Sequence, residues 1–362
     1  MSNAVSAQAN SADHSVSRLT HQTSASDIVV VMIHGISRNG AGDNCNSHNS
    51  FGDAKNVLEA SGYSPQQLVT LGYYGADQQS TDGQSGCDAL ISEIATTLDP
   101  SGNTISSDCG NTDPTTFDNN TPIETLSCYI SWFLYLTYTT QGIPVQLVGH
   151  SLGGIIIRYA MYEAGQSVFY YNSDYAYTLN FAPPALVTDV VTFGTPHAGI
   201  PATIANDILC GTGVLFLSGC EEGDELDSSS SFMQNLITDP NSATPNGQSQ
   251  TQWNMIGSQC GIDFAFPGTQ RGCAFENENT SLQMQGGNKY YYLCQWFSDS
   301  SCYSHNGYLQ DSSPALDENI DYCGNCQPEP PSWLEYTNMS EYTNMPHSLT
   351  LLAMLLLHQY PT

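Results

Sequence analysis

The chain has 362 residues, with 35 Asp plus Glu against 6 Lys plus Arg and a formal net charge of -29 at pH 7. So few bases cannot neutralise the phosphates of DNA or RNA, which excludes a nucleic-acid partner. Every apolar run falls short of the roughly 18 residues that span a bilayer, so we expect a soluble protein.

Residues 1–26 are rich in Ser, Ala, Asn and Thr and show no apolar periodicity, which predicts a disordered segment or one that lies on the surface. A single α/β domain is expected to follow, from residue 27 to residue 362. Continuous apolar runs are typical of strands that are buried on both faces of a parallel sheet. Such runs predict strands over residues 28–33, 68–73, 145–148, 189–193, 253–256 and 290–293.

Helical spacing of apolar residues alternates with these strands. The connections between strands are long enough for crossover helices, so the alternation predicts an α/β fold with a doubly wound, mostly parallel sheet. A polar stretch over 99–121, which contains Cys109, is predicted to be an insertion pinned by disulfides. The predicted helices cover residues 54–60, 87–98, 123–140, 152–163 and 349–359.

The chain contains 12 cysteines, a number that favours an oxidising compartment and hence a secreted protein, extracellular or periplasmic. The N-terminus carries no positively charged, apolar signal region, so secretion is inferred from the cysteines alone. Metal-ligand spacing is absent, because the Cys-x-x-Cys at Cys323 and Cys326 has neither a second pair nor a His at finger spacing. Short disulfide-closed loops are predicted between Cys210 and Cys220, Cys260 and Cys273, and Cys294 and Cys302.

The sequence pI of about 4.1 reflects missing bases rather than an excess of acids. We therefore predict a surface built largely from Ser, Thr, Asn, Gln and Tyr. Near the pI the carboxylates are largely protonated and their mutual repulsion fades. Acid tolerance is the resulting hypothesis, and a stability profile that collapses below about pH 5 would remove it.

The segment Gly149-His150-Ser151-Leu152-Gly153 fits the pattern G-x-S-x-G and lies between a predicted strand and an apolar helix. In that context the serine sits on a strained turn that raises its hydroxyl toward a substrate, and the flanking glycines let strand and helix approach. The start of the following helix also favours developing negative charge. A glycine-rich turn without chemistry is the alternative interpretation.

Three segments in one order resemble the bacterial triacylglycerol lipases and related serine esterases of the α/β-hydrolase fold. They are residues 29–35 (VVVMIHG), 148–154 (VGHSLGG) and 192–199 (TFGTPHAG). The resemblance covers residues 27–199 well and the remainder in general layout. It implies that the backbone N–H groups of Ile36 and Leu152 form the oxyanion hole. Residues expected to shape or line the pocket are His34, Gly35, His150, Thr195, Pro196 and His197.

In this fold the catalytic acid and histidine follow the serine along the chain. That order leaves His305, His347 and His358 as candidates for the base. We favour His305, which lies in a polar turn after a predicted strand and resembles the His-x-Gly-x-Leu turn of small bacterial lipases. Asp263, a few residues beyond the predicted strand 253–256, is the predicted acid that orients the base, with Asp239 in reserve.

Residues 200–240 are predicted to form an insertion beside the pocket. Within it, residues 204–217 are markedly apolar and an acidic run follows over 221–227. An apolar segment at this point resembles a lipase lid or the wall of an acyl pocket. An ordinary packed helix fits the pattern equally well.

The sequence thus predicts a secreted serine hydrolase that cleaves carboxylic esters through an acyl-enzyme on Ser151, with His305 moving the proton and Asp263 orienting it. The apolar segment favours lipid acyl esters, hence a lipase or esterase. We expect no metal, no cofactor, a monomer, and transient contact with a lipid interface. A phospholipase, an acyltransferase or a polyester depolymerase on the same scaffold is the alternative. A catalytically inert secreted binding protein is the alternative from another class.

Overall fold

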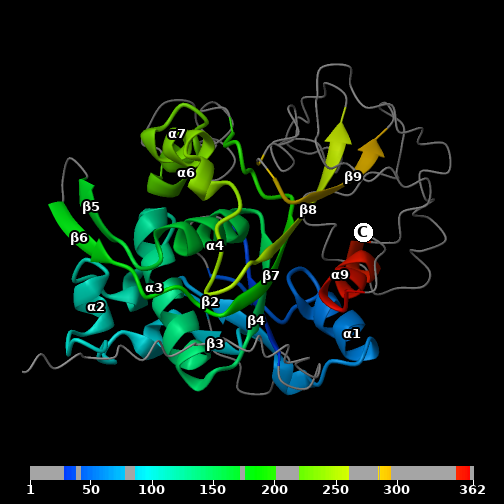
Figure 1. Cartoon of the computed structure of the whole chain (residues 1–362), viewed down its shortest axis with the longest axis horizontal. Helices are drawn as coiled ribbons and strands as arrows, with labels where there is room; N and C mark the ends of the chain where they lie inside the picture. Colours follow the sequence, from blue (N-terminus) through cyan, green and yellow to red (C-terminus); the bar gives the residue numbers. More distant parts are fainter. Residues whose placement is uncertain are drawn as a thin grey trace, which may run out of the picture.

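A parallel sheet runs through the middle of the computed structural model, which describes residues 28–37, 42–77, 86–171, 176–200, 220–260, 284, 286–294 and 348–358 (Figure 1). Seven strands of the described chain form it in the order β3-β2-β1-β4-β7-β8-β9. All neighbouring pairs are parallel, which confirms the predicted doubly wound α/β fold. The strands are β1 (Val29–Ile33), β2 (Leu68–Gly72), β3 (Ala89–Leu90), β4 (Val145–His150), β7 (Val187–Phe193), β8 (Gln252–Cys260) and β9 (Asn288–Cys294).

Strand β1 is a continuous apolar run because both faces of the sheet are covered. Its side chains alternate between the two faces, as the pleat of a strand requires. Val31 and Ile33 belong to one hydrophobic core cluster, and Val30 and Met32 belong to the other. All four are fully buried.

Helices cover the two faces of the sheet in pairs (Figure 1). On one face lie α3 (Ile123–Thr137) and α4 (Leu152–Glu163), which pack against each other. On the other face lie α1 (Gly52–Ala60) and α9 (Ser348–Leu356), and these two also pack together. Their apolar side chains complete the two core clusters.

The direction in which the sheet is wound reverses between β1 and β4. The strands that follow β1 add on one side of it, whereas those that follow β4 add on the other side. At such a switch point two loops leave the carboxyl edge of the sheet in opposite directions, and the crevice between them is where open α/β sheets bind ligands. The loop after β1 and the turn after β4 meet at this point.

Several elements of the structure go beyond those that the apolar patterns predict. An antiparallel hairpin, β5 (Ser167–Tyr171) with β6 (Ala176–Asn180), follows α4. Two helices, α6 (Glu221–Leu226) and α7 (Ser231–Thr238), lie above α4 in Figure 1. The remaining short helices are α2 (Ile105–Asp108) and the 3-10 turns η3 (Pro65–Gln67), η4 (Ile91–Ile94), η5 (Pro114–Thr116), η6 (Thr139–Gln141) and η8 (Pro240–Ser242).

The helix predicted over 87–98 is wrong, because this segment forms strand β3 and then the single 3-10 turn η4. Two contacts explain the difference. Cys87 is bonded to Cys45, and the carboxylate of Asp88 accepts the backbone N–H of Thr70 at 2.9 Å. These contacts hold the chain alongside β2 in an extended conformation, and tertiary context overrides the helical spacing.

Two disulfides lie in the first half of the described chain. Cys45 pairs with Cys87, and Cys109 pairs with Cys128 on α3. The second bond ties the 99–121 insertion to the core, as predicted. Cys220 is also disulfide-bonded. The predicted partners Cys210, Cys273 and Cys302 lie outside the described residues, so those three pairings stay predictions.

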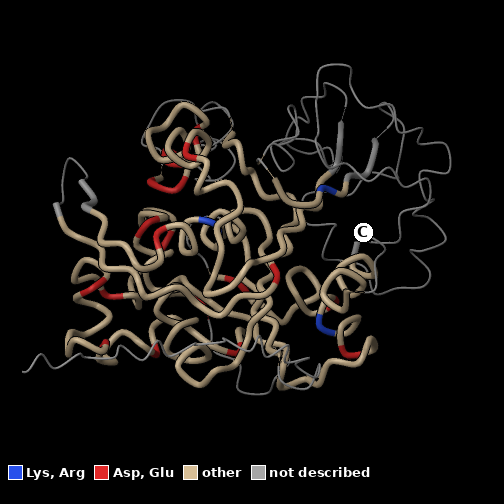
Figure 2. The backbone as a smooth tube through the Cα atoms, viewed as in Figure 1, with Lys and Arg blue, Asp and Glu red and all other residues tan. Residues whose placement is uncertain are grey.

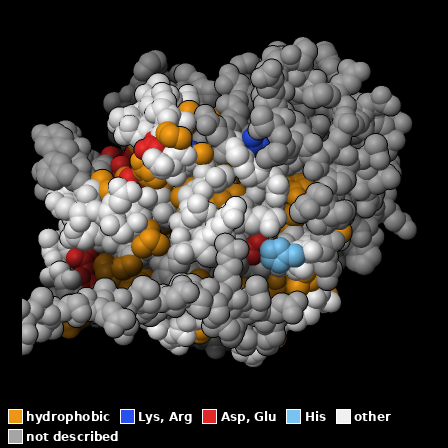
Figure 3. Space-filling view, viewed as in Figure 1, with side chains coloured by type: hydrophobic (Ala, Val, Ile, Leu, Met, Phe, Trp, Pro, Cys, Tyr) orange, Lys and Arg blue, Asp and Glu red, His pale blue; other side chains and the backbone are white. Residues whose placement is uncertain are grey.

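Charged side chains are sparse in the described part of the chain, and basic ones especially so (Figure 2). The face shown in Figure 3 is mostly neutral where it is described, with small apolar areas between polar side chains and backbone. Within the described ranges, no helix combines the length and apolar character that crossing a membrane would require.

Candidate active site

Ser151 occupies the sharp turn between β4 and α4, where its φ and ψ are 54° and -124°. A residue with a Cβ rarely adopts this conformation, which costs on the order of 1–3 kcal/mol and persists only where the surroundings enforce it. One such restraint is the hydrogen bond from the Ser151 N–H to the carbonyl of Phe193 on β7, at 2.9 Å. The turn leaves the serine as the N-cap residue of α4, at the positive end of the helix dipole.

Glycines allow the strand and helix to pass close to one another around this turn. A Cβ on Gly149 would lie 2.6 Å from the Cα of Gly154, and a Cβ on Gly153 would lie 2.2 Å from the carbonyl oxygen of Ile33. Real Cβ atoms do not approach other atoms so closely. The first turn of α4 is therefore pressed against the end of β1, which carries the predicted oxyanion loop.

Gly35 brings that loop directly against the serine. A Cβ on Gly35 would lie 2.8 Å from the Cβ of Ser151 and 3.3 Å from Nδ1 of His150. Ile36 follows, half-buried and packed against the α3–α4 side of the core, and Leu152 is the buried first residue of α4. The structure thus brings together all the predicted residues of the loop after β1 and of the serine turn.

His34, the last residue before this loop, is buried and held by carboxylates. Its Nε2 lies 3.0 Å from Asp77 and its Nδ1 lies 3.8 Å from Asp43. Burial lowers the pKa of His34, but the charge and hydrogen bond of Asp77, with further support from Asp43 and the Gly35 carbonyl, raise it to about 9. The ring is therefore an imidazolium at neutral pH and cannot accept a proton from the serine.

Asp77 carries the matching negative charge. Burial alone raises the pKa of this carboxyl, but the charge of His34 and hydrogen bonds from His34 and from backbone N–H groups hold it below its usual value. The sequence patterns did not single out Asp77. Its place just beyond the carboxyl end of β2 is the signal that marks it, because that edge of the sheet also carries Ser151.

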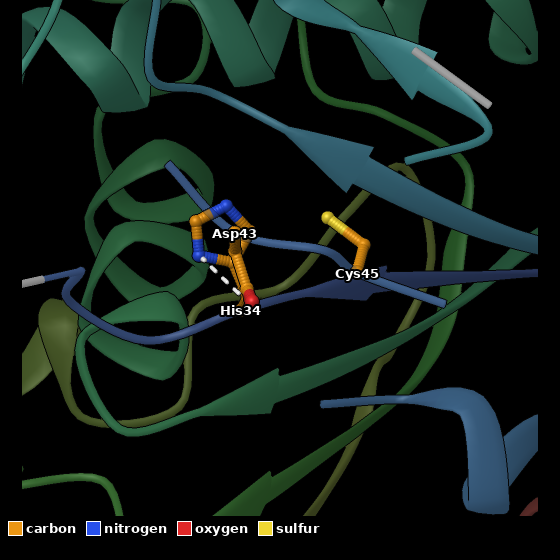
Figure 4. Close-up of side chains that lie close together, drawn as sticks. All are labelled: His34, Asp43 and Cys45. Atoms are coloured by element: carbon orange, nitrogen blue, oxygen red, sulfur yellow. Dashed lines mark ion pairs between the residues drawn. The ribbon is translucent and has the colours of Figure 1, made fainter. Parts of the chain in front are cut away.

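His34, Asp43 and Cys45 form the one group in the described ranges whose side chains could be considered for a metal ion (Figure 4). Their nearest ligand atoms lie within 4.8 Å of one another. The chemistry of the set does not fit a metal, because the sulfur of Cys45 is bonded to Cys87 and the His34 ring is already engaged by Asp77. The group is better described as an ion pair beside a disulfide.

The turn after β7 holds Thr195, Pro196 and His197, all of which are buried. The Nε2 of His197 lies 3.0 Å from the hydroxyl of Thr192. Burial, with the positive charges of Arg158 and Lys289, holds the pKa of His197 well below its usual value, so the ring is neutral. These contacts give His197 a packing role in the turn after β7.

Arg158 of α4 fixes this turn to the helices above it. Its guanidinium is buried and donates to the carbonyl oxygens of His197 at 2.9 Å, Ser242 at 2.6 Å and Leu236 at 2.5 Å. Burial lowers its pKa to about 10, which leaves it charged. One side chain therefore joins α4, the turn after β7, α7 and η8.

Two of the alternative site residues lie away from the serine. His358 follows α9, and its Nε2 lies 3.5 Å from Asp189 near the amino end of β7, whereas Ser151 follows the carboxyl end of β4. Asp239 accepts the hydroxyl of Tyr162 at 2.6 Å, and Tyr162 is 11 residues after Ser151, about 16 Å along the helix axis.

The other members of the predicted triad, Asp263 and His305, lie outside the described residues, as does the alternative base His347. The same holds for residues 204–217, the predicted lid or acyl-pocket wall, and for residues 1–26. The structure does describe where the strands before Asp263 and His305 end. β8 and β9 are parallel neighbours that end in register at Cys260 and Cys294, on the edge of the sheet that carries Ser151.

The acidic run 221–227 contains the helix α6, and two of its glutamates are buried in the protein rather than solvated. Both carboxyl oxygens of Glu222 lie within 2.9 Å of the Tyr74 hydroxyl. Glu225 accepts the backbone N–H of Ile123 at 2.7 Å and faces the carboxyl of Glu124. Burial raises the pKa of all three carboxyls, those of Glu222 and Glu225 well above their usual range.

The strand order and the strained serine turn at the switch point define the α/β-hydrolase fold. No protein-family model matches the sequence, and no curated protein is significantly similar to it. Among solved structures, the chain is similar to the phospholipase PlaB from Legionella pneumophila, at 14% identity and a TM-score of 0.37 over 64% of this chain and 39% of that one. The chain is also similar to lipase B of Aspergillus fumigatus, at 8% identity and a TM-score of 0.36 over 80% of this chain and 51% of that one.

A third similar structure is the mature lipase BlEst2 of Bacillus licheniformis, at 15% identity and a TM-score of 0.31 over 66% of this chain and 68% of that one. The chain spans only 39% and 51% of the Legionella and Aspergillus proteins. The assignment of the fold rests on the strand order and on the turn at Ser151, not on these likenesses.

Proposed function

We propose that this protein is a serine hydrolase that cleaves carboxylic esters through an acyl-enzyme on Ser151. The observation that supports this most strongly is the backbone of Ser151, held at φ 54° and ψ -124° against Gly35. Strain of this kind is retained where it serves a function, and a serine raised on a strand-to-helix turn is the arrangement that nucleophilic catalysis needs.

In the proposed mechanism the hydroxyl of Ser151 attacks the ester carbonyl, and the carbonyl oxygen becomes an oxyanion. The backbone N–H groups of Ile36 and Leu152 stabilise it, and the amino end of α4 adds a favourable dipole. The serine proton passes through the base to the leaving oxygen, so that the alcohol departs and the acyl group stays on the serine. Water then attacks the acyl-enzyme, the oxyanion forms again, and its collapse releases the carboxylic acid and restores the Ser151 hydroxyl.

The base and acid proposed for these proton transfers are His305 and Asp263. Asp263 comes three residues after the end of β8, and His305 comes 11 residues after the end of β9. Both strands end on the edge of the sheet that carries Ser151, and the base and acid of such a triad must reach this edge. His34 and His197 are unsuitable as bases, because the first is already charged and the second is buried against Thr192.

The proposed substrates are lipid acyl esters, taken up by a monomer that touches a lipid interface transiently. The apolar segment 204–217 within the 200–240 insertion is the feature that favours a lid or an acyl pocket. Secretion is proposed from the disulfides at Cys45 and Cys109, since such bonds persist in oxidising compartments.

A covalent probe tests the proposed function directly. We expect a fluorophosphonate to form one adduct, at Ser151 by peptide mass spectrometry, and to form none in Ser151→Ala. A series of p-nitrophenyl esters from acetate to palmitate then ranks acyl chain lengths. A folded protein that forms no adduct and turns over no ester would favour the inert binding protein instead.

A further inference from the structure

The carbonyl oxygen of Gly35 accepts hydrogen bonds from two buried side chains. The hydroxyl of Tyr73 lies 2.8 Å from it, and Nδ1 of His34 lies 2.7 Å from it. A carbonyl oxygen has two lone pairs, so both bonds can form together. The direction of the Gly35 carbonyl is therefore set from two sides, by groups on the ends of β1 and β2.

This carbonyl belongs to the same peptide unit as the N–H of Ile36. A trans peptide is planar, and its C=O and N–H point in opposite directions. Fixing the carbonyl of Gly35 therefore fixes the direction of the Ile36 N–H, the donor that the proposed function places in the oxyanion hole. A Cβ on Gly35 would lie only 2.8 Å from the Cβ of Ser151, so this peptide lies beside the proposed nucleophile.

We propose that Tyr73 and Asp77 are positioning residues of the oxyanion hole, which hold the Gly35–Ile36 peptide in the orientation that catalysis requires. The proposal rests on the proposed function for its effect on turnover. Tyr73 acts directly on the Gly35 carbonyl, whereas Asp77 acts through the His34 ring.

Asp77 is suited to this role because its carboxylate gathers donors from three separate segments. It accepts Nε2 of His34 at 3.0 Å, the N–H groups of Tyr73 and Tyr74 at 2.7 and 2.8 Å, and the N–H of Asp43 at 2.6 Å. The loops after β1 and β2 and the chain at Asp43 are thus tied to one buried carboxylate. Its charge also keeps a hydrogen on both ring nitrogens of His34, so that Nδ1 can donate to Gly35.

Tyr73 is held in place by His34 and Asp77 as well. Its ring stacks on the His34 ring with centroids 4.2 Å apart and an interplanar angle of 11°. An aromatic ring beside an imidazolium in a buried site is favourable, and it restricts both rings. The Tyr73 hydroxyl also lies 3.1 Å from the carbonyl oxygen of His34, so it reaches the chain on both sides of the Gly35 Cα.

The first test removes the hydroxyl in Tyr73→Phe and compares it with Tyr63→Phe. Tyr63 is a buried tyrosine whose hydroxyl bonds Gln146 and the carbonyl of Leu356 at the opposite edge of the sheet. We expect similar losses of melting temperature in both variants. For Tyr73→Phe alone we expect kcat on an ester to fall by about 10- to 100-fold with KM within about twofold, because a misplaced oxyanion donor affects the transition state selectively. Equal kcat in the two variants would overturn the role of Tyr73.

The second test applies the same comparison to the carboxylate. Asp77→Asn is expected to lower kcat in the same way, whereas Asp88→Asn is expected to affect only stability. Asp88 is the matched control, because it also accepts a backbone N–H, that of Thr70 on β2, while its side-chain partners Lys55 and Asn46 do not belong to the oxyanion loop. A normal kcat in Asp77→Asn would remove Asp77 from the proposal.

A measurement without turnover separates this proposal from the proposed function. The backbone amide of Ile36 should have an NMR order parameter near that of rigid backbone, about 0.85, in the wild type and Tyr63→Phe, and a clearly lower value in Tyr73→Phe and Asp77→Asn. An unchanged order parameter would overturn the positioning role even in an active enzyme. If the wild type forms no fluorophosphonate adduct while the order parameter responds as expected, the proposed function fails and the structural role stands.

Discussion

Gly154 and Thr195 pack directly against each other: a Cβ on Gly154 would lie 2.1 Å from the hydroxyl oxygen of Thr195 and 2.8 Å from its Cβ. The contact joins the first turn of α4 to the turn after β7. Because Ser151 is the N-cap residue of α4, the packing of Thr195 against Gly154 restricts the position of the Ser151 backbone.

Gly154→Ala is therefore expected to lower the free energy of unfolding by about 1–3 kcal/mol, the usual cost of overpacking, and to reduce turnover. Thr195→Gly should relieve the clash. The double variant should therefore lose less free energy of unfolding than the sum of the losses in the two single variants. Urea denaturation of the four proteins gives the coupling, which we expect to reach about 1 kcal/mol. Simple additivity would contradict the contact.

The backbone at Ser151 makes a separate prediction about stability. Glycine adopts φ 54° and ψ -124° without the steric cost that any Cβ imposes. Ser151→Gly should consequently be more stable than Ser151→Ala by about 1 kcal/mol or more, although both lack the nucleophile. Chemical denaturation at neutral pH measures the difference. Equal stabilities would show that the turn is not strained in solution.

Arg158 is expected to be among the costliest single side chains to remove. In Arg158→Met the apolar volume is largely kept, but the carbonyls of His197, Leu236 and Ser242 lose their donor. Each buried unsatisfied group costs on the order of 1–3 kcal/mol, partly offset because a charge no longer needs to be buried. We expect a net loss of about 2–4 kcal/mol in thermal or urea unfolding. A loss below about 0.5 kcal/mol would mean that water replaces the guanidinium.

The buried carboxyls that dock α6 contribute stability that falls as the pH rises. Burial raises the pKa of Glu225, beside Glu124, well above the value of 4.5 that applies in the unfolded chain. Between those two pKa values the folded state holds more protons than the unfolded state, so the free energy of unfolding decreases as pH increases. The contribution is fully present below about pH 4.5 and is lost progressively above it. This direction suits the acid tolerance inferred from composition.

Glu225→Gln should flatten the decline in melting temperature between about pH 5 and pH 8. Asp224→Asn, an exposed acid on the same helix, is the matched control and should leave the slope unchanged. His34 contributes a loss in the same direction, from its unfolded pKa near 6.5 up to about 9, and it does so equally in both variants. A wild-type slope retained in Glu225→Gln would show that this carboxyl is ionised in the folded protein.

The central sheet could be predicted from the sequence because its signals are local. Residues 29–33 are apolar throughout, which is typical of a strand covered on both faces, and the helix after Ser151 runs from Leu152 to Glu163 as predicted. The serine turn and the loop at Gly35 were predicted by motif, and their proximity follows from parallel strands ending at the same edge.

The features that sequence reasoning missed depend on partners far along the chain. In the sequence Glu222 and Glu225 resemble solvated acids, yet both are buried. The Tyr74 hydroxyl donates to Glu222 and the Ile123 N–H donates to Glu225, from 148 and 102 residues away. Asp77 is one acid among 35 in the sequence, and only the meeting of three segments distinguishes it. Such long-range pairings leave no periodic signal in the residues themselves.

Helix α9 has a consequence for how the chain reaches its native state. It covers Val30, Met32 and Val148 from one side of the sheet, and the carbonyl of Leu356 meets the Tyr63 hydroxyl across 293 residues of chain. While the ribosome still holds residues 348–356, α1 is present on this face of the sheet but the cover that α9 provides is missing. We therefore expect the nascent protein to expose hydrophobic surface until α9 has left the ribosome, and chaperone protection to matter most before that moment.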